Sequence, residues 1–510
     1  MFMPPYGGVN FPYKTNLNWI IFQIMELKQK TGNLEQAWAD FQIKFESELD
    51  QTVKDQLTVW LNDGTLESLI DNLTNKLVWV SVKDYGATGD GTTDDTQSIT
   101  NAIQAASSNT KSIVFFPPGK YRITANINVP KNTQLIGIQP GYYDTSMSDS
   151  GTWLFIENPD TTASTGVNSC GTFRLYGGCK VSGFGVYYPL QSAPNIGKFT
   201  AYSPAFQIRT AGYIEISNIT SVNPYTLILA NAETGGYYIH DIRGYAYKTL
   251  VHIIRNTEII NIENITMNTS ILVQYGFELS TEATNNLRNT VTCVLVRGSD
   301  WSRFEKIFAY NVNSAITLQS FLDGTGTNRT TRHVEIIGCG CGNTNTGINI
   351  NGLPNSNFQT NNILINGCDL YAVQYGIYGG DADGVKIIGN SFRGTGRAIN
   401  LSTMKSTIIS NNEMFNLVFD AEQIVINGEN TVITNNIITS ERTPGIYVNG
   451  NSSHNVTIIG NVINNGSNVS SIRNGGSPIP IGVVTLNSYS GSLGVTIASG
   501  VNENNFKITT

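Results

Sequence analysis

Short apolar runs recur along most of this chain and are separated by polar corners. Each run closes on a glycine, serine or asparagine, and successive runs lie on average about 24 residues apart. The clearest closing residues are Gly338, Gly367, Gly389, Ser410, Asn435 and Gly460. Repeats of this length supply one short strand and tight turns each, and equivalent strands pair from coil to coil. The pattern therefore predicts an all-β parallel solenoid.

The N-terminal residues 1–75 follow a different pattern. Large apolar residues recur at steps of three, four or seven between Ile20 and Trp60, which predicts amphipathic helices. Trp38 and Phe41 belong to this stripe. So short a segment holds more large aromatic side chains than it can bury alone. The pattern favours a bundle of several chains, and a helix lying on its own domain is the alternative.

A strand, a glycine-rich turn, a short helix and a further strand are predicted between residues 82 and 124. Asp94 and Asp95 stand at the helix N-cap, and Ile99 and Ile103 share one helix face. Such an element would cover the open end of the first coil. The aspartates of this segment are therefore expected to be structural.

This segment reads VKDYGATGDGTTDDTQSITNAIQAA, followed by SIVFFPPGKYRIT, and resembles the start of the pectate-lyase-like right-handed parallel β-helices. That family is common among bacteriophage tailspikes and appendages. Residues 12–53 are similar to N-terminal modules of structural proteins from phages of Gram-positive bacteria. The resemblance implies a homotrimer in the virion that binds a bacterial surface glycan and attaches to phage tail or connector proteins through its N-terminal region.

Three regions are expected. Residues 1–75 would be a helical region for virion anchoring and trimerisation, residues 76–470 the right-handed parallel β-helix, and residues 471–510 a small C-terminal β cap. The last region is assigned because the repeat breaks there.

Composition and charge argue against nucleic acid and membranes as partners of this protein. The formal net charge is −7, which argues against nucleic acid, and no apolar run is long enough to span a membrane. The start lacks the apolar segment of a signal peptide, so synthesis in the host cytoplasm is expected. The four histidines belong to no metal signature, and neither a cofactor nor a metal is predicted.

Cysteines and asparagines both fit a stacked structure. Cys339 and Cys368 follow equivalent glycines and are predicted to be neighbours in one column, as reduced thiols, with a disulfide as the alternative. Several asparagines are predicted to be stacked turn residues that accept left-handed backbone and bond their own chain. They are Asn218, Asn264, Asn390, Asn411, Asn412, Asn435, Asn436 and Asn461.

Catalysis, if present, is expected to depend on carboxylates. Asp381 and Asp383 stand two residues apart, so on a strand they would share a face about 6.5–7 Å apart. That separation suits an inverting glycoside hydrolase. The alternative is a turn, because Gly-Gly-Asp-Ala-Asp-Gly is also ordinary turn composition.

Side chains suited to sugar binding lie near these aspartates. Tyr371, Tyr375 and Tyr378 precede them, and Arg393 follows. Aromatic faces pack on sugar rings, and guanidinium groups hold acidic substituents. The four residues are predicted to bind substrate.

Two further clusters are weaker candidates. Asp420 and Glu422 form a second pair at the same spacing with Glu413 nearby, and they are added as catalytic candidates. Trp301 stands beside Asp300 near a predicted loop and is added as a substrate-binding residue. Each cluster could also be a solvated corner.

We therefore expect an appendage that binds capsule or teichoic acid during adsorption and cleaves it by carboxylate-based hydrolysis. A non-catalytic receptor-binding or structural fibre protein is the first alternative. A polysaccharide lyase is the second, although we find no convincing set of calcium ligands with a basic proton acceptor.

Overall fold

The computed structural model describes most of the chain from Trp79 onward and parts of the region before it. The described residues are 24, 27, 34–44, 51–68, 79–108, 112–141, 147, 151–158, 171–210, 212–231, 235–256, 258–322, 326–353, 360–394, 396–415, 421–440, 444–449, 455–465, 471–475, 481–485, 487–490, 495–496, 500–503 and 506–507.

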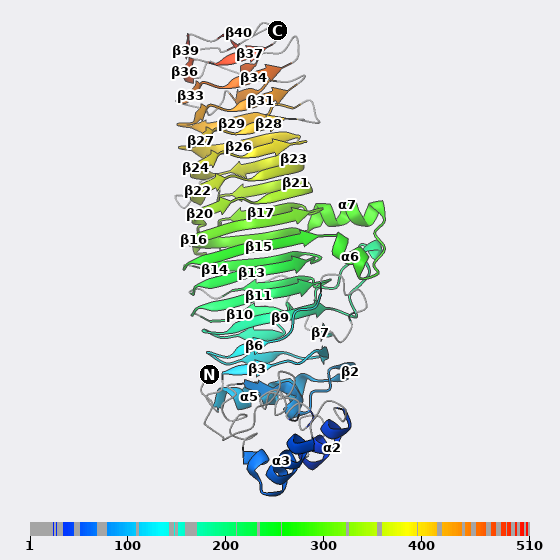
Figure 1. Cartoon of the computed structure of the whole chain (residues 1–510). Helices are drawn as coiled ribbons and strands as arrows, with labels where there is room; N and C mark the ends of the chain where they lie inside the picture. The colour runs from blue at the N-terminus through cyan, green and yellow to red at the C-terminus, as the bar shows by residue number, and fades with distance from the viewer. Residues whose placement is uncertain are drawn as a thin grey trace.

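The body is a parallel β-helix, so the predicted all-β, right-handed solenoid is confirmed (Figure 1). Thirty-eight strands form one continuous sheet, in which the strands of successive coils pair in parallel. The strands lie in three columns, called here the first, second and third face. A side hairpin of β18 (Phe321–Leu322) and β19 (Asn328–Arg329) is antiparallel.

The first face carries strands that begin each three-sided coil. They are β1 (Trp79–Ser81), β3 (Ile113–Phe115), β6 (Gln134–Ile136), β9 (Lys180–Tyr187), β11 (Ile214–Ser221), β13 (Tyr237–Gly244), β15 (Ile260–Asn268), the middle of β16 (Thr292–Tyr310), β20 (Arg332–Ile337), β22 (Thr360–Asn366), β24 (Ala382–Ile388), β27 (Ile408–Ser410), β30 (Val432–Thr434), β33 (Val456–Ile459), β36 (Ile481–Thr485) and β39 (Gly500–Glu503).

The second face includes the ends of β9, β11, β13, β15 and β16, which pass around a corner. Its other strands are β2 (Asp90–Asp94), β4 (Gly119–Ile123), β7 (Thr152–Ile156), the starts of β21 (Gly340–Asn351) and β23 (Asp369–Gly380), β25 (Ser391–Arg393), β28 (Glu413–Phe415), β31 (Ile437–Ser440), β34 (Val462–Asn465), β37 (Ser488–Ser490) and β40 (Phe506–Lys507).

The third face includes the start of β16 and the ends of β21 and β23. Its other strands are β5 (Ile127–Val129), β8 (Phe173–Leu175), β10 (Phe206–Ile208), β12 (Thr226–Ala230), β14 (Thr249–Asn256), β17 (Ser314–Gln319), β26 (Arg397–Lys405), β29 (Ile424–Glu429), β32 (Ile446–Asn449), β35 (Ile472–Gly475) and β38 (Val495–Thr496).

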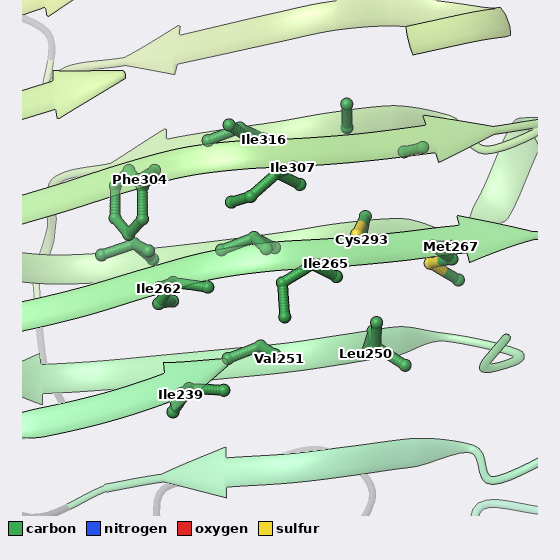
Figure 2. Packing of buried hydrophobic residues seen from close by; sticks show 14 of the residues in the cluster. Ile239, Leu250, Val251, Ile262, Ile265, Met267, Cys293, Phe304, Ile307 and Ile316 are labelled. Carbon is green, nitrogen blue, oxygen red and sulfur yellow. The ribbon is translucent and has the colours of Figure 1, made fainter. Parts of the chain in front are cut away.

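Like side chains stack through the interior of the β-helix. Ile239, Ile262 and Phe304 stand opposite one another on three successive coils, and all are fully buried (Figure 2). Ile242, Ile265 and Ile307 repeat this arrangement one corner later. Burial of each such side chain contributes roughly 1.5–3 kcal/mol, so the stacked core is the main source of stability.

One left-handed residue per coil forms the corner between the first and second faces. The positive-φ residues there are Gly183, Asn218, Asp241, Asn264, Lys306, Gly338, Gly367, Gly389, Asn411, Asn435 and Gly460. The predicted closing residues match this column except for Ser410, which is the last residue of β27. Asn411 makes the corner instead, because asparagine tolerates left-handed backbone better than serine.

The asparagines that follow these corners are stacked turn residues that bond their own chain, as predicted, but they do not adopt the left-handed backbone that was also expected. Asn390, Asn412, Asn436, Asn461 and Asn487 are buried. The Oδ1 atom of each of the last four accepts hydrogen bonds from the backbone N–H and Nδ2 of the preceding member, at 2.9–3.0 Å. The amides therefore join neighbouring coils and leave few buried polar groups unsatisfied.

The cysteines continue this column toward the N-terminus. Cys368 donates its backbone N–H to Asn390 Oδ1 at 2.9 Å, and Cys339 follows the corner residue Gly338 on the preceding coil. All five described cysteines are free and buried. Burial raises the pKa of Cys341 to about 12, so this thiol stays protonated at neutral pH.

The end of the β-helix is covered by α5 (Thr96–Ser108), as predicted (Figure 1). Ile99, Ala102 and Ile103 are completely buried against the first coil. Asp95 does not bond its own helix through its carboxylate. That carboxylate accepts the N–H groups of Thr88 (2.6 Å) and Gly89 (3.0 Å), and so holds the preceding turn.

Two described helices, α2 (Leu34–Lys44) and α3 (Gln51–Asn62), precede the β-helix. Trp38 and Phe41 stack at 5.7 Å and are buried with Leu57 in a small apolar cluster of this one chain. This cluster buries part of the apolar stripe within one chain, and the expected bundle of several chains stays a prediction.

The sequence predicts two longer loops, at residues 139–170 and 275–300, and such loops usually carry functional surface in this kind of fold. Within the second, α7 (Thr281–Thr290) begins with the Ser280 hydroxyl accepting from Ala283 N–H, and β16 starts at Thr292. The short helix α6 (Ser270–Gln274) precedes it. Most of the first connection lies outside the described residues. Within the described residues, none of the helices is long and apolar enough to cross a membrane.

Candidate functional site

A groove of about 630 Å³ lies on the second face. Strands β16, β21, β23 and β25 contribute to it from four successive coils. The lining residues are Phe308, Gly340, Cys341, Asp369, Tyr371, Arg393 and Gly394.

Glycines make the floor of the groove. Gly340 stands opposite Phe308, and Gly342 stands opposite Tyr310 on the adjacent coil. A Cβ atom at Gly342 would lie 2.9 Å from the Tyr310 ring, and one at Gly340 would lie 3.3 Å from the Phe308 ring. Because Gly340 and Gly342 have no side chains, the rings of Phe308 and Tyr310 on the neighbouring coil lie over these two positions.

A third ring forms the other side of the groove. Tyr371 is half exposed, and its ring lies directly over Gly394, where a Cβ atom would come within 2.2 Å. Gly394 also has positive φ, at 57°. A side chain at this position would displace the tyrosine ring and strain the backbone.

An ion pair crosses the groove floor. Arg393 Nε donates to Asp369 Oδ1 at 3.0 Å, and an Nη2–Oδ2 contact completes a two-point pair. Both side chains are about half exposed, at 48% and 49%. Such an exposed pair contributes little to stability, and its polar atoms stay accessible to a ligand.

The structure brings only some of the predicted site residues together. Tyr371 and Arg393 line the groove. Tyr375 and Tyr378 lie on the third face, where their rings are 4.9 Å apart. Trp301 lies at the corner between the third and first faces.

The predicted carboxylates are spread over several positions. Asp381 occupies a corner with φ of 55°, and Asp383 is in β24 opposite Asn361 and Lys405. Glu413 is an exposed residue of the second face, opposite Ser391.

Glu422 forms an ion pair with Arg397 at 3.0 Å, which places this carboxylate on the third face beside β26. Asp420 lies outside the described residues. Among the described residues, no three His, Cys, Asp or Glu side chains converge as metal ligands would.

Sequence reasoning missed Phe308, Gly340 and Asp369. A signal for Gly340 is present in the motif GCGCG of residues 338–342, in which glycine and cysteine alternate. The alternation of buried cysteine with outward glycine is the pattern of a strand whose outer surface is bare.

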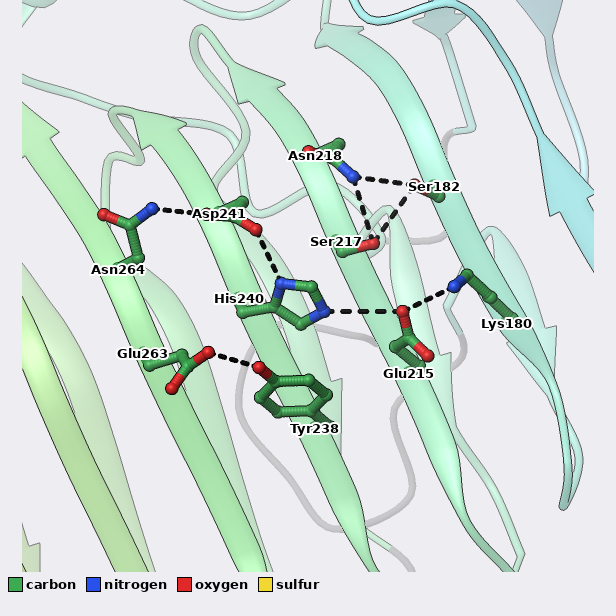
Figure 3. Close-up of polar contacts among 10 residues, drawn as sticks. All are labelled: Lys180, Ser182, Glu215, Ser217, Asn218, Tyr238, His240, Asp241, Glu263 and Asn264. Carbon is green, nitrogen blue, oxygen red and sulfur yellow. Dashed lines mark hydrogen bonds and ion pairs between the residues drawn. The ribbon is translucent and has the colours of Figure 1, made fainter.

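A second polar array lies on the first face and links β9, β11, β13 and β15 on four successive coils (Figure 3). Glu215 pairs with Lys180 at 2.7 Å and lies 3.4 Å from His240 Nε2. The other ring nitrogen of His240 lies 2.7 Å from Asp241.

Partial burial alone would raise the pKa of Glu215. Hydrogen bonds and charge from Lys180 and His240 outweigh that effect and hold the pKa below its usual value. Burial likewise opposes hydrogen bonds from His240 and Asn264 at Asp241, whose net pKa is also lowered.

Tyr238 completes the array. Its ring stacks on His240 at 4.0 Å, and its hydroxyl donates to Glu263, as Figure 3 shows. The hydrogen bond to Glu263 is the largest cause that raises the pKa of Tyr238 to about 12. Each charge in this array has a partner, so its simplest role is to tie the outer surfaces of neighbouring coils together.

Comparison with known proteins agrees with this architecture. Residues 79–273 match the family model described as rhamnogalacturonase A/epimerase, pectate lyase-like. A tailspike protein mutant of E. coli bacteriophage HK620, solved in complex with a pentasaccharide, has a TM-score of 0.51. It is 11% identical, and the match covers 83% of this chain and 77% of that one. At that identity, the likeness shows the fold.

Two phage proteins are similar in sequence. The pre-neck appendage protein of Bacillus phage B103 is 26% identical over 213 residues, which is 41% of this chain and 23% of that protein. The pre-neck appendage protein of Bacillus phage phi29 is 32% identical over 124 residues, or 24% of this chain and 14% of that protein. The matches thus span less than a quarter of either relative.

The fold is that of a right-handed parallel β-helix, and residues 79–273 match the pectate-lyase-like family model. Parts of the chain are similar in sequence to the pre-neck appendage proteins of Bacillus phages. The resemblance predicted from the sequence and the predicted place in a phage virion are confirmed by these relatives.

Proposed function

We propose that this protein is a phage tail appendage that binds a polysaccharide of the host cell surface in the groove of its second face. One observation carries the proposal: a glycine floor lies between three aromatic rings and the accessible Arg393–Asp369 pair. Aromatic faces pack on the apolar faces of sugar rings. The ion pair offers donors and acceptors to hydroxyl or acidic groups.

The relatives support the phage part of the proposal, since their names place them as pre-neck appendages of Bacillus phages. We further propose that three copies assemble and that residues 1–75 attach the assembly to tail or connector proteins. The groove is open to solvent along the coils, which suits a polymer better than a small enclosed ligand.

The binding test uses purified wall polysaccharide from Bacillus immobilised on a sensor surface. Tyr371→Ala should weaken binding at least tenfold, because it removes the ring that lies over Gly394. Tyr378→Ala is the matched control, since Tyr378 is a partly exposed tyrosine on the third face. Equal loss in both variants, or no binding by the unmodified protein, would contradict the proposal.

Glycan hydrolysis is a second candidate function. Asp369 and Glu413 occupy the same outward column on either side of Ser391, two coils apart. Equivalent residues two coils apart are separated by about 9.6 Å, near the upper end of carboxylate spacing in inverting hydrolases. Asp381, Asp383, Asp420 and Glu422 stay candidates for the same chemistry.

Incubation with the same polysaccharide tests cleavage. Release of reducing ends that is lost in Glu413→Gln and Asp369→Asn, but kept in Asp383→Asn and Glu422→Gln, would support the Asp369–Glu413 pair on the second face. The reverse result would favour the sites predicted from sequence. Absorbance from unsaturated uronates would indicate a lyase instead, and no release at all would leave the protein a binder.

A further inference from the structure

A second left-handed corner column separates the third face from the first. Pairing of the flanking strands sets its seven members opposite one another from coil to coil. They are Trp301, His333, Asn362, Gly384, Ser406, Asn430 and Asn455. Five are the small residues expected where φ is positive, whereas the two adjacent members at one end carry rings.

Those two rings form one flat surface. Trp301 and His333 have φ of 50° and 51°, and their rings stack at 4.5 Å with an interplanar angle of 13°. Trp301 is nevertheless 62% exposed, one of the most exposed large apolar side chains among the described residues. The outer face of the indole is therefore open to solvent.

A partly buried carboxylate, that of Asp300, holds this pair. Asp300 is 14% exposed and lies 2.6 Å from His333 Nδ1 and 2.8 Å from Arg332 Nε. It also accepts the backbone N–H of Trp301 at 3.0 Å. Asp300 thus holds the imidazole of His333 at its Nδ1 edge, and the indole of Trp301 packs on a face of the same ring.

Local stability does not explain the rings. A non-glycine residue in left-handed backbone destabilises the fold by roughly 1–2 kcal/mol, and glycine or asparagine would form the corner with less strain. One stacked ring pair stabilises the fold by only about 0.5–1.5 kcal/mol. Two strained bulky residues with an exposed outer face indicate a surface that contacts something outside the chain.

We propose that Trp301 and His333 form a second carbohydrate-binding platform, on which one sugar residue of the bound polymer stacks. This inference rests on the proposed polysaccharide-binding function. A flat aromatic face suits the apolar face of a pyranose ring, and Arg332, half exposed at its edge, supplies donors for hydroxyl groups. His333 and Asp300 act as positioning residues that hold the indole.

The platform and the groove lie on different parts of the coil. The groove belongs to the second face, and the platform stands at the corner between the third and first faces. One chain would thus contact a polymer, or two strands of it, at two points. Linked contacts raise the apparent affinity for a polymer far more than the affinity for a short oligosaccharide.

The test compares Trp301→Asn with Trp301→Tyr in binding to immobilised Bacillus wall polysaccharide. Asparagine keeps the corner, as Asn362 does two coils away, but removes the ring. We expect an unchanged or higher melting temperature with at least fivefold weaker polymer binding, and tyrosine should restore most of the binding. Asn362→Ser, at the same corner without a ring, is the control and should bind normally.

Outcomes separate this inference from the proposed function. Normal binding by Trp301→Asn, with loss in Tyr371→Ala, would overturn the platform and leave the groove. A changed oligomeric mass of Trp301→Asn with normal polymer binding would make the rings a contact between copies and would also overturn it. Failure of the unmodified protein to bind would overturn both.

Discussion

Asn436 donates its backbone N–H and its Nδ2 to the single Oδ1 atom of Asn461 on the next coil, at 3.0 and 2.9 Å. The same two-donor arrangement repeats from Asn390 to Asn487. All members are buried, so each amide satisfies the backbone of its neighbour where water cannot.

Asn436→Ala should destabilise the β-helix by roughly 2–5 kcal/mol, because the two donors of Asn412 lose their acceptor and Asn461 Oδ1 keeps only the backbone N–H of residue 436. Asn435→Gly is the control, since Asn435 makes the left-handed corner that glycine also adopts. Urea unfolding followed by circular dichroism measures both. Equal midpoints for the two variants would show that the buried column does not stabilise the fold.

Asp381 should tolerate asparagine but not valine. Its φ of 55° suits asparagine, whereas a β-branched residue in left-handed backbone costs roughly 1–2 kcal/mol. We expect Asp381→Asn to unfold within about 0.5 kcal/mol of the unmodified protein, as surface changes usually do.

Asp383→Val is the matched control for Asp381→Val. Asp383 lies in β24, where valine is favoured, so this variant should not be destabilised. If Asp381→Val unfolded at the same urea concentration as the unmodified protein, the corner would not constrain this residue.

Acid should weaken the array on the first face. The pKa values of Glu215 and Asp241 are lowered in the folded chain. Their stabilisation is therefore complete above the unfolded pKa of about 4, and is lost as the pH falls through the lower folded values. Glu215→Gln should lower the melting temperature at pH 7 and approach the unmodified protein near pH 3.

Glu413→Gln is the control for that pH series, since Glu413 is an exposed glutamate outside the array. Its difference from the unmodified protein should stay small at every pH. A Glu215→Gln effect that persists unchanged at pH 3 would mean that packing, and not charge, is the contribution of Glu215.

Phe41→Asp should unfold the N-terminal helices. Phe41 is completely buried between Trp38 and its neighbours, so a carboxylate there would cost several kcal/mol. Ile43→Asp, on the same helix but 76% exposed, should leave the helices folded. Limited proteolysis of the full chain measures this difference, because an unfolded N-terminal region is cut faster than a folded one.

A different result would support the predicted bundle of several chains. If Phe41→Asp kept its resistance to proteolysis but dissociated into monomers by light scattering, the stripe would pack between chains. Dissociation of Ile43→Asp alone would instead place the contact between chains on the exposed side of α2.

The sequence by itself determined the repeating coils of the β-helix, the helix α5 that covers its end, and most of the left-handed corners. Gly338, Gly367 and Gly389 recur at the coil period because each coil must turn with left-handed backbone, and that demand is local. The covering helix α5 could be predicted for the same reason, since Ile99 and Ile103 are one helical turn apart and therefore share a face.

Only the tertiary structure decided which outward residues meet. Phe308, Asp369 and Arg393 lie on different coils, and coils of unequal length leave no fixed spacing to reveal their column. Tyr371 and Tyr378 are close in sequence, yet the coil turns between them and sends them to different faces. In a parallel β-helix, the pairing of strands between coils decides which outward side chains become neighbours. That pairing depends on residues far apart in the sequence, so it is not a local property of the chain.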